Sequence, residues 1–309
     1  MLPRRSILSV PGHREKMHAK ALASEADAII FDLEDSVPLE VKKDARRQVI
    51  QTLETIGENT PHLSFRMNAL DTPFGYRDLL EVMEAAGRRL GSVVVPKVNH
   101  PGDIHFVDRM IDGIGLAQGK PLSIGIEASI ETAQGLEQVK KIARASRRVQ
   151  ALVFGIADYS ASVGARLVSL SGHGEKEEDI YPGHRWHFAL SRLVMTAKAR
   201  GILAIDAPYG YFKDDAGLVR SARMACALGC DGKWAIHPAQ IDTINRVFTP
   251  SAEDIERAQK VLAAADAARI AGRGAVAVEG RMIDQATVGL ARRVWEQARA
   301  LKLIDTPEA

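Results

Sequence analysis

Acidic side chains follow three apolar runs of this chain, and carboxylates in this arrangement suit a divalent cation. Glu131 and Asp158 each come just after such a run, and the segment Asp32–Asp35 closes an earlier one. Proteins usually hold Mg²⁺ with one or two carboxylates together with substrate oxygens and water. The pattern predicts metal-assisted chemistry on an oxygen-rich substrate, with Glu131 and Asp158 as ligands. The structural alternatives are a helix-start acid for Glu131 and a helix N-cap for Asp158.

Eight short apolar runs are the expected strands that position these acids. They are Ile7–Val10, Ala28–Asp32, Leu63–Met67, Ser92–Val98, Leu122–Glu127, Ala151–Ile156, Ile202–Ala207 and Lys233–His237. Most are continuous rather than alternating, which is typical of parallel strands buried on both faces. The expected helices between them are Arg14–Ala23, Arg77–Leu90, Gly135–Ala145, His184–Arg200, Asp215–Leu228 and Pro238–Val247.

This alternation of strands and helices predicts an α/β protein, a (β/α)8 TIM barrel. A doubly wound sheet is the alternative, but no glycine-rich dinucleotide fingerprint follows a strand. The barrel domain is expected to span residues 1–250, and residues 251–309 to form a separate C-terminal module. That module is predicted to contain a helical linker over Ala252–Ala268, a hairpin within 275–283 and a last helix over Gln285–Leu301.

One connection departs from the regular alternation. The polar segment Val168–Gly183 is too long for a routine link between a strand and a helix. Because it follows the sixth run, a barrel would place it at the catalytic mouth. It is interpreted either as a lid or as an ordinary surface loop.

Charged side chains stand at most of the expected strand ends, where a barrel builds its active site. Arg66 ends the third run, and its planar guanidinium matches a carboxylate with two parallel hydrogen bonds. We expect Arg66 to bind the substrate; the alternative is a salt bridge to Asp32, Glu34 or Asp35, and both can hold at once. Lys97 ends the fourth run and is expected to support the same site.

Basic and histidine side chains elsewhere each have two interpretations. Arg14 and Lys20 follow the turn after the first run and either meet phosphates or lie on a solvated helix face. The segment Ile236–Pro238 ends the eighth run, and its histidine either shapes a turn or takes part in the chemistry. His184 and His187 have the spacing of a zinc pair, but no third ligand stands at a suitable distance, so structural roles are expected.

The composition argues against several classes of function. The 309 residues carry a net charge of +2, which does not suit a strongly basic nucleic-acid surface. No apolar run approaches the roughly 20 residues of a membrane helix, and the first residues lack a signal-peptide pattern. Cys226 and Cys230 are expected on one helix face as reduced, buried thiols of a cytoplasmic protein, with a metal pair as the alternative.

Taken together, the motifs resemble those of the citrate lyase beta-subunit-like (HpcH/HpaI aldolase) superfamily of carbon–carbon lyases. The matching stretches are Phe31–Val37, Arg66–Phe74, Val95–Val98, Ile130–Gly135, Gly155–Asp158, Gly232–Pro238 and Glu279–Asp284. Within the superfamily, Asn68–Pro73 and Gly232–Pro238 are most similar to the L-malyl-CoA/β-methylmalyl-CoA lyase branch. The resemblance covers essentially the whole chain, although Tyr159 stands where Phe is common.

The resemblance implies a role for each matching residue of the site. Glu131 and Asp158 would bind Mg²⁺, or Mn²⁺ in its place, and Arg66 would bind the carboxylate of a 2-oxoacid. Asp284 would be the catalytic acid or base and would reach the site of a neighbouring subunit, so that the tail caps its neighbour. A homotrimer or homohexamer is the assembly that the resemblance implies.

The resemblance also implies a coenzyme A thioester as substrate. Arg14 and Lys20 would approach the CoA phosphates, and Ile236, His237 and Pro238 are further candidates for contact with CoA. L-malyl-CoA would give glyoxylate and acetyl-CoA, and β-methylmalyl-CoA would give glyoxylate and propionyl-CoA, both reversibly.

Three other functions remain open at this point. An (S)-citramalyl-CoA lyase, giving pyruvate and acetyl-CoA, would use the same residues, because one methyl group is worth only about 1–3 kcal/mol of discrimination. A malyl-CoA thioesterase would hydrolyse the substrate on the same scaffold. A non-catalytic subunit of a lyase complex is the third, although it would not need charged side chains at so many strand ends.

Overall fold

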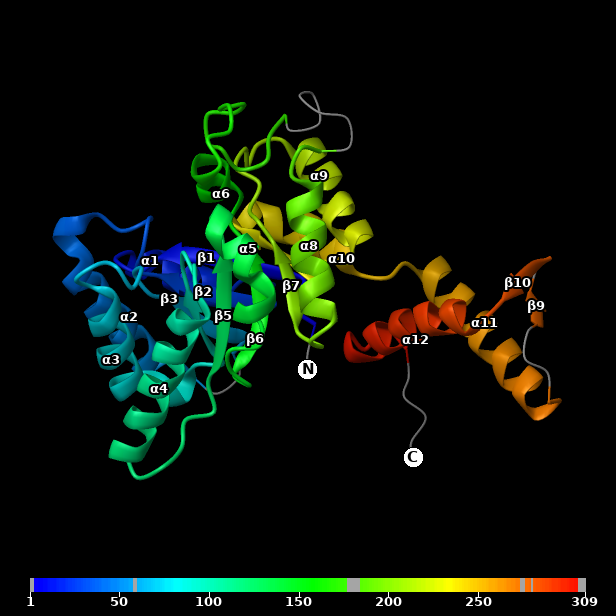
Figure 1. The fold of residues 1–309 in the computed structure, drawn as a ribbon, viewed down its shortest axis with the longest axis horizontal. Helices are drawn as coiled ribbons and strands as arrows, with labels where there is room; N and C mark the ends of the chain where they lie inside the picture. The colour runs from blue at the N-terminus through cyan, green and yellow to red at the C-terminus, as the bar shows by residue number, and fades with distance from the viewer. Residues whose placement is uncertain (1–2, 58–59, 177–183, 273–275, 279, 305–309) are drawn as a thin grey trace. The chain divides into compact units, whose positions relative to one another are not determined.

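A computed structural model describes residues 3–57, 60–176, 184–272, 276–278 and 280–304 of the chain (Figure 1). Eight parallel strands pair in sequence order, and the last pairs with the first, so the sheet closes into the expected barrel. The strands are β1 Ser6–Pro11, β2 Ala28–Asp32, β3 His62–Arg66, β4 Ser92–Val95, β5 Gly125–Ile130, β6 Val149–Phe154, β7 Leu203–Asp206 and β8 Gly232–Ala235. This closed order excludes the doubly wound sheet.

Helices cover the outside of the barrel. They are α1 Glu15–Leu22, α2 Lys42–Thr55, α3 Gly75–Ala86, α4 Pro101–Ala117, α5 Ala133–Ile142, α6 Ile156–Ser162, α8 His187–Lys198, α9 Asp215–Leu228 and α10 Ile241–Phe248. Short 3-10 turns add η1 Leu39–Val41, η2 Gly87–Arg89 and η3 Pro238–Gln240. The helices α2, α4 and α6 were not predicted. Charged residues mask the apolar stripe of α2, which buries Ala45, Val49 and Leu53 at every fourth position.

Two strand boundaries differ from the prediction in a way that affects the site. The fifth strand was expected over Leu122–Glu127, but β5 runs from Gly125 to Ile130. Leu122 is buried but precedes the first residue of β5 that pairs with β4. The apolar run therefore indicated which residues are buried, not which residues pair in the sheet. As a result, Glu131 directly follows β5. The sixth strand ends at Phe154, and Asp158 lies in the first turn of α6 rather than at a strand end.

The barrel interior is packed with apolar side chains contributed by several strands. The cluster consists of Ile7, Ala28, Ile30, Val94, Ala151, Val153, Ile205 and Trp234. All eight are at most 7% exposed, so the interior is a core rather than a channel. The rigid strands can therefore hold the side chains at their carboxyl ends in fixed positions.

A buried ion pair links Glu127 in β5 to Arg4, which lies two residues before β1. Arg4 donates to the Glu127 carboxylate, and Ser92 Oγ donates to the same oxygen over 2.6 Å. Burial alone would raise the pKa of Glu127. The Arg4 guanidinium, His62 and Ser92 outweigh burial and lower this pKa to about 2.

We expect Glu127→Gln to lower the free energy of unfolding at neutral pH by about 3 kcal/mol, because the Arg4 charge stays buried without its partner. The folded pKa of Glu127 lies below its ordinary value of 4.5, so the pair stabilises fully above that pH. Its contribution is lost as the pH falls toward 2. Urea unfolding at a series of pH values would measure this. The difference in the free energy of unfolding between wild type and variant should shrink as the pH falls, and a constant difference would contradict the assignment.

A second compact unit comprises residues 246–309 with the first three residues, and the barrel unit comprises Arg4–Asn245. The second unit contains α11 Ala252–Ile270, the antiparallel pair β9 Val276–Val278 and β10 Arg281–Ile283, and α12 Gln285–Ala300. It has its own apolar cluster, which includes Val261, Ile283 and Ala291. Of the expected hairpin, Ala275 and Glu279 lie outside the described residues.

The described residues contain no helix with the length and apolar character needed to span a membrane. The two cysteines are not joined in a disulfide, and the structure corrects their expected placement. Cys230 is buried, but Cys226 is exposed on α9. The helix ends at Leu228 and Gly229 follows in a left-handed conformation, so the two thiols do not share one helix face.

Candidate active site

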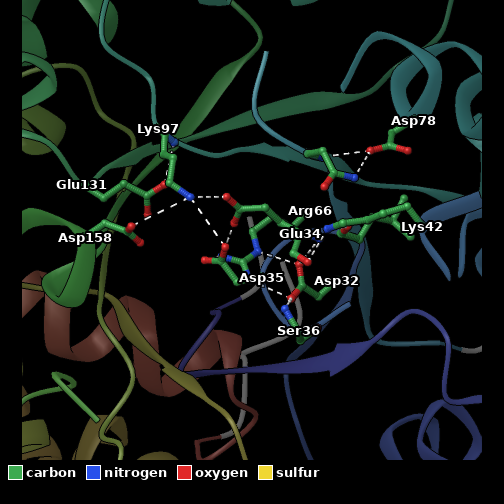
Figure 2. Close-up of polar contacts among 12 residues, drawn as sticks. Asp32, Glu34, Asp35, Ser36, Lys42, Arg66, Asp78, Lys97, Glu131 and Asp158 are labelled. Carbon is green, nitrogen blue, oxygen red and sulfur yellow. Dashed lines mark hydrogen bonds and ion pairs between the residues drawn. The ribbon is translucent and has the colours of Figure 1, made fainter. Parts of the chain in front are cut away.

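Arg66 and Asp32 form the fixed centre of the charged cluster at the carboxyl ends of the strands (Figure 2). Arg66 Nε and Nη2 each donate to one oxygen of Asp32 over 2.7 Å, and Arg66 Nη1 lies 2.7 Å from Glu34 Oε2. The backbone N–H groups of Glu34 and Ser36 also donate to Asp32. The salt bridge that was the alternative role of Arg66 is thus present, and it fixes the plane of the guanidinium.

Burial and neighbouring charges divide the acidic cluster into two kinds of carboxyl. Burial alone would raise the pKa of Asp32, but Arg66 and the donated hydrogen bonds outweigh it and lower this pKa to about 2. The pKa of Glu34 is raised, because burial and the charge of Asp35 outweigh the effects of Arg66 and Lys97. Asp32 is therefore a permanent anion that anchors Arg66, whereas Glu34 accepts a proton more readily.

Lys97 connects the acidic cluster to the predicted metal ligands. Its Nζ lies 2.5 Å from Glu34, 3.7 Å from Asp35 and 3.9 Å from Asp158, and Figure 2 shows it between these groups. Its backbone N–H donates to Glu131 Oε1 over 2.6 Å. Burial lowers the pKa of Lys97, but the hydrogen bond and charge of Glu34 outweigh it, so this pKa is raised and the ammonium stays charged.

Glu131 and Asp158 approach the same region from two successive β–α units (Figure 2). Glu131 is 4% exposed, and burial and the charge of Glu34 raise its pKa to about 7. The structure does not support the alternative roles, a helix-start acid for Glu131 and a helix N-cap for Asp158. Thr132, rather than Glu131, caps α5, and Gly155 occupies the N-cap position of α6.

These two carboxylates fit a divalent cation. The hydrogen bond that Glu131 makes is to a neutral backbone N–H, so a buried anion there gains from a nearby positive ion. Within the described part of the chain, no group of three or more His, Cys, Asp or Glu side chains could hold a metal by itself. A cation at Glu131 and Asp158 would therefore take its other ligands from substrate and water, as Mg²⁺ commonly does.

Gly155 leaves the space that the Glu131 side chain occupies. A Cβ atom at this position would lie 2.3 Å from Glu131 Oε2 and 2.4 Å from its Cβ. We expect Gly155→Ala to displace the carboxylate and to lower kcat by about 10²-fold, the cost of a misplacement of about 1 Å in an active site. Steady-state kinetics with a Mg²⁺ titration would measure this.

The matched control is Gly113→Ala in α4, where an added Cβ meets no atom within 4 Å. That variant should keep wild-type turnover and Mg²⁺ dependence. Equal kinetics for the two variants would show that Gly155 is not needed to place Glu131.

Two residues of this region were not predicted. The ring of Trp234 lies under Arg66, with 5.5 Å between the guanidinium carbon and the ring centroid. Lys42 is buried, and its ammonium donates to the backbone carbonyls of Leu33 and Glu34. Trp234 could have been predicted to lie near the site from its position in the eighth apolar run. Lys42 stands in a charged segment, and no sequence feature indicates that it is buried there.

The candidate CoA residues lie at two places around the barrel. Arg14 and Lys20 are exposed at the start and end of α1. His237 accepts a hydrogen bond from the backbone N–H of Ala239, so it shapes the turn before α10, as one interpretation predicted. Its ring also stacks on Phe212, with the centroids 4.7 Å apart.

Two further groups of predicted residues lie elsewhere. His184 accepts a hydrogen bond from the backbone N–H of Trp186, and His187 begins α8. Asp284 belongs to the second unit, where it caps α12 and accepts hydrogen bonds from Thr287 N and Oγ1. Of the predicted loop Val168–Gly183, residues 177–183 lie outside the described residues.

The structure is a parallel barrel with an arginine, a lysine and convergent carboxylates at its strand ends. Known proteins can be compared with this fold and site. Residues 5–238 match the model of the HpcH/HpaI aldolase/citrate lyase family, and the chain belongs to this family. It is therefore an enzyme of a carbon–carbon lyase family. The predicted family resemblance is confirmed.

Individual relatives are similar over nearly the whole chain. The L-malyl-CoA/beta-methylmalyl-CoA lyase of Cereibacter sphaeroides is 39% identical over 304 residues, which cover 97% of this chain and 96% of that protein. The malyl-CoA/beta-methylmalyl-CoA/citramalyl-CoA lyase of Chloroflexus aurantiacus is 32% identical, covering 97% and 87%. Protein CitE of Mycobacterium tuberculosis, solved with magnesium, acetoacetate and coenzyme A, is 28% identical with a TM-score of 0.73, covering 96% and 98%.

Proposed function

We propose that this chain is a Mg²⁺-dependent lyase that reversibly cleaves L-malyl-CoA or β-methylmalyl-CoA. The observation that carries the proposal is the buried Glu131 carboxylate, placed with Asp158 beside the Arg66 cluster at the barrel mouth. The names of the similar lyases and the magnesium and coenzyme A bound to CitE support it. The products would be glyoxylate with acetyl-CoA or propionyl-CoA.

In this proposal Glu131 and Asp158 hold the metal. Bound there, Mg²⁺ or Mn²⁺ supplies Lewis-acid stabilisation of negative charge on a substrate oxygen. Arg66 orients the carboxylate of the oxoacid part, and Asp32 keeps the guanidinium in the required plane. Lys97 holds Glu34 and adds positive charge beside Asp158.

The coenzyme A part would extend from the mouth toward basic and aromatic side chains. Arg14 and Lys20 are exposed and free to approach its phosphates. Ile236, His237 and Pro238 present a partly apolar surface after β8, to which Phe212 contributes its stacked ring. Flat apolar groups of this kind suit contact with the thioester arm or the base of CoA.

We further propose that Asp284 moves the proton of the acyl-CoA enolate. The cleavage leaves an enolate that must be protonated, and a positioned carboxyl group can deliver that proton. Asp284 is exposed in the second unit. In a homotrimer or homohexamer it would complete the site of a neighbouring subunit. A cytoplasmic location fits two cysteines that are not joined in a disulfide.

The choice of substrate is tested by one panel of assays. L-malyl-CoA, β-methylmalyl-CoA and (S)-citramalyl-CoA would each be supplied with Mg²⁺, and glyoxylate and pyruvate would be quantified. The proposal expects the two glyoxylate-forming reactions to have the larger kcat/KM. The name of the Chloroflexus relative favours (S)-citramalyl-CoA as the second candidate, and a larger kcat/KM with pyruvate as product would select it.

A further inference from the structure

The segment around His173 lies against the loops that follow β6 and β7. A Cβ atom placed on Gly172 would lie 3.6 Å from the Cβ of Ala157, the residue before the predicted ligand Asp158. The backbone N–H of Gly210 donates to the carbonyl of His173 over 3.0 Å. These contacts place His173 at the carboxyl end of the barrel, beside the predicted metal ligands.

Local hydrogen bonds build this turn. Glu175 is 8% exposed and accepts hydrogen bonds from the hydroxyls of Ser169, over 2.8 Å, and Ser171, over 2.6 Å. Ser171 Oγ in turn accepts the backbone N–H of His173 over 3.1 Å. Gly172 and Gly174, on either side of the histidine, have φ of 68° and 93°, a conformation that favours glycine. The position of His173 is thus set by its own loop.

The imidazole of His173 has a buried polar atom that the described residues do not satisfy. Its Nδ1 is buried and has no hydrogen-bond partner among them. Burial lowers the pKa of His173, although Glu175 and Asp158 oppose this, so the ring is neutral at neutral pH. Asp158, Arg66 and Asp35 all influence this pKa, which places the ring within electrostatic reach of the charged cluster.

A buried nitrogen without a partner costs free energy unless a ligand supplies one. Of the charged groups that act on this ring, the proposed function assigns Arg66 to the carboxylate of the oxoacid part and Asp158 to the metal. Free glyoxylate offers only acceptor oxygens, and a neutral imidazole can carry its proton on Nδ1. An acceptor at this place would therefore select the Nδ1–H tautomer.

We infer that His173 binds substrate, donating a hydrogen bond from Nδ1 to an oxygen of the 2-oxoacid part. The inference deepens the proposed function and rests on it for the identity of that oxoacid. It assigns a substrate contact to the turn over residues 169–175. His173 would then favour substrates whose oxoacid part places an acceptor oxygen at this loop.

The test uses three substitutions on the full-length protein. His173→Asn places an amide that can donate near the position of Nδ1, His173→Asp has the same shape without a donor at neutral pH, and His173→Ala removes the group. The readouts are the Kd of glyoxylate with saturating Mg²⁺, measured by calorimetry, and KM against kcat for L-malyl-CoA. We expect Ala and Asp to weaken glyoxylate binding about 10-fold or more, the effect of losing a hydrogen bond to a charged group. The variant His173→Asn should keep most of the wild-type affinity for glyoxylate.

Controls separate this role from packing and from the reaction itself. His187→Asn, on the exposed start of α8, should leave both readouts unchanged. Wild-type binding by His173→Ala, or rescue by His173→Phe rather than Asn, would overturn the inference, as would a wild-type protein that does not bind glyoxylate. If the wild type binds glyoxylate with the expected variant pattern but does not cleave the thioesters, the inference stands and the proposed function fails.

Discussion

Asp284→Asn is expected to lower the rate of cleavage by about 10²- to 10⁴-fold, the usual contribution of a general acid or base. The variant should bind Mg²⁺ as the wild type does, because the predicted ligands Glu131 and Asp158 belong to the barrel unit. In the described structure Thr287 donates to Asp284 and lowers the pKa of its carboxyl group. An ionised Asp284 can remove a proton from the acyl-CoA in the condensation direction, and its protonated form can return one after cleavage.

Asparagine is the informative substitution because it is also a good N-cap. It keeps an oxygen that can accept from Thr287, so α12 should remain capped while the ionisable group is lost. The measurements are single-turnover kinetics for the chemical step and a Mg²⁺ titration for the metal. Near-normal cleavage by Asp284→Asn would exclude Asp284 as the acid or base.

Mixing subunits tests whether the tail acts on a neighbour. Subunits carrying Asp284→Asn would be combined with subunits carrying Glu131→Gln, each inactive alone. If the tail completes another subunit's site, mixed assemblies should contain some sites with both groups intact and should regain activity. Activity that stays at the level of the separate variants would argue that each chain completes its own site.

Glu131→Gln is expected to weaken Mg²⁺ binding by more than the roughly 10- to 100-fold that mutation of an outer-shell partner costs. In the metal-free protein, burial raises the pKa of Glu131 to about 7, so protons compete with the metal. Mg²⁺ affinity of the wild type should therefore rise as the pH approaches about 7 and level off above it. The variant should lose this pH dependence.

The stability of the metal-free protein gives an independent check on Glu131. Its folded pKa lies above the ordinary value of 4.5, so the protonated form suits the fold. The contribution of this carboxyl group to the free energy of unfolding is fully present below pH 4.5 and is lost as the pH rises through about 7. Gln mimics the protonated form, so Glu131→Gln should be at least as stable as the wild type above pH 7. Glu137→Gln, on the exposed face of α5, is the matched control and should change neither property.

A variant that loses both stability and Mg²⁺ affinity would indicate a structural role for Glu131. Unchanged Mg²⁺ dependence would contradict its assignment as a ligand. The two outcomes are distinct because a ligand buried without a metal destabilises the fold, whereas a structural carboxylate stabilises it.

The barrel was predictable because its strands are buried on both faces and appear as continuous apolar runs. Strand ends were less predictable, as β5 shows: Leu122 is buried but lies outside the ladder. The convergence of Glu131 and Asp158 could still be predicted, because an error of a few residues in a strand boundary leaves both acids at the same end of the barrel. The pattern of apolar residues thus indicates which chain segments meet, but not which backbone groups pair.

Contacts between distant side chains could not be predicted from spacing. Lys97 was expected only to support the site, but its ammonium reaches both Glu34 and Asp158 while its backbone binds Glu131. Such a role depends on the geometry of four β–α units at once. His173 was missed for a similar reason, since its surroundings come from the loops after β6 and β7.

The central claim is that this chain breaks a carbon–carbon bond of a 3-hydroxyacyl-CoA at the Glu131–Asp158 site. The most direct measurement is the product balance with L-malyl-CoA, with and without Mg²⁺, scoring glyoxylate, acetyl-CoA and free CoA. We predict equal amounts of glyoxylate and acetyl-CoA, formed only when Mg²⁺ is present, with no release of free CoA. Free CoA without glyoxylate would identify a thioesterase, and absence of any turnover across the thioester panel would indicate a non-catalytic subunit; either result would contradict the account.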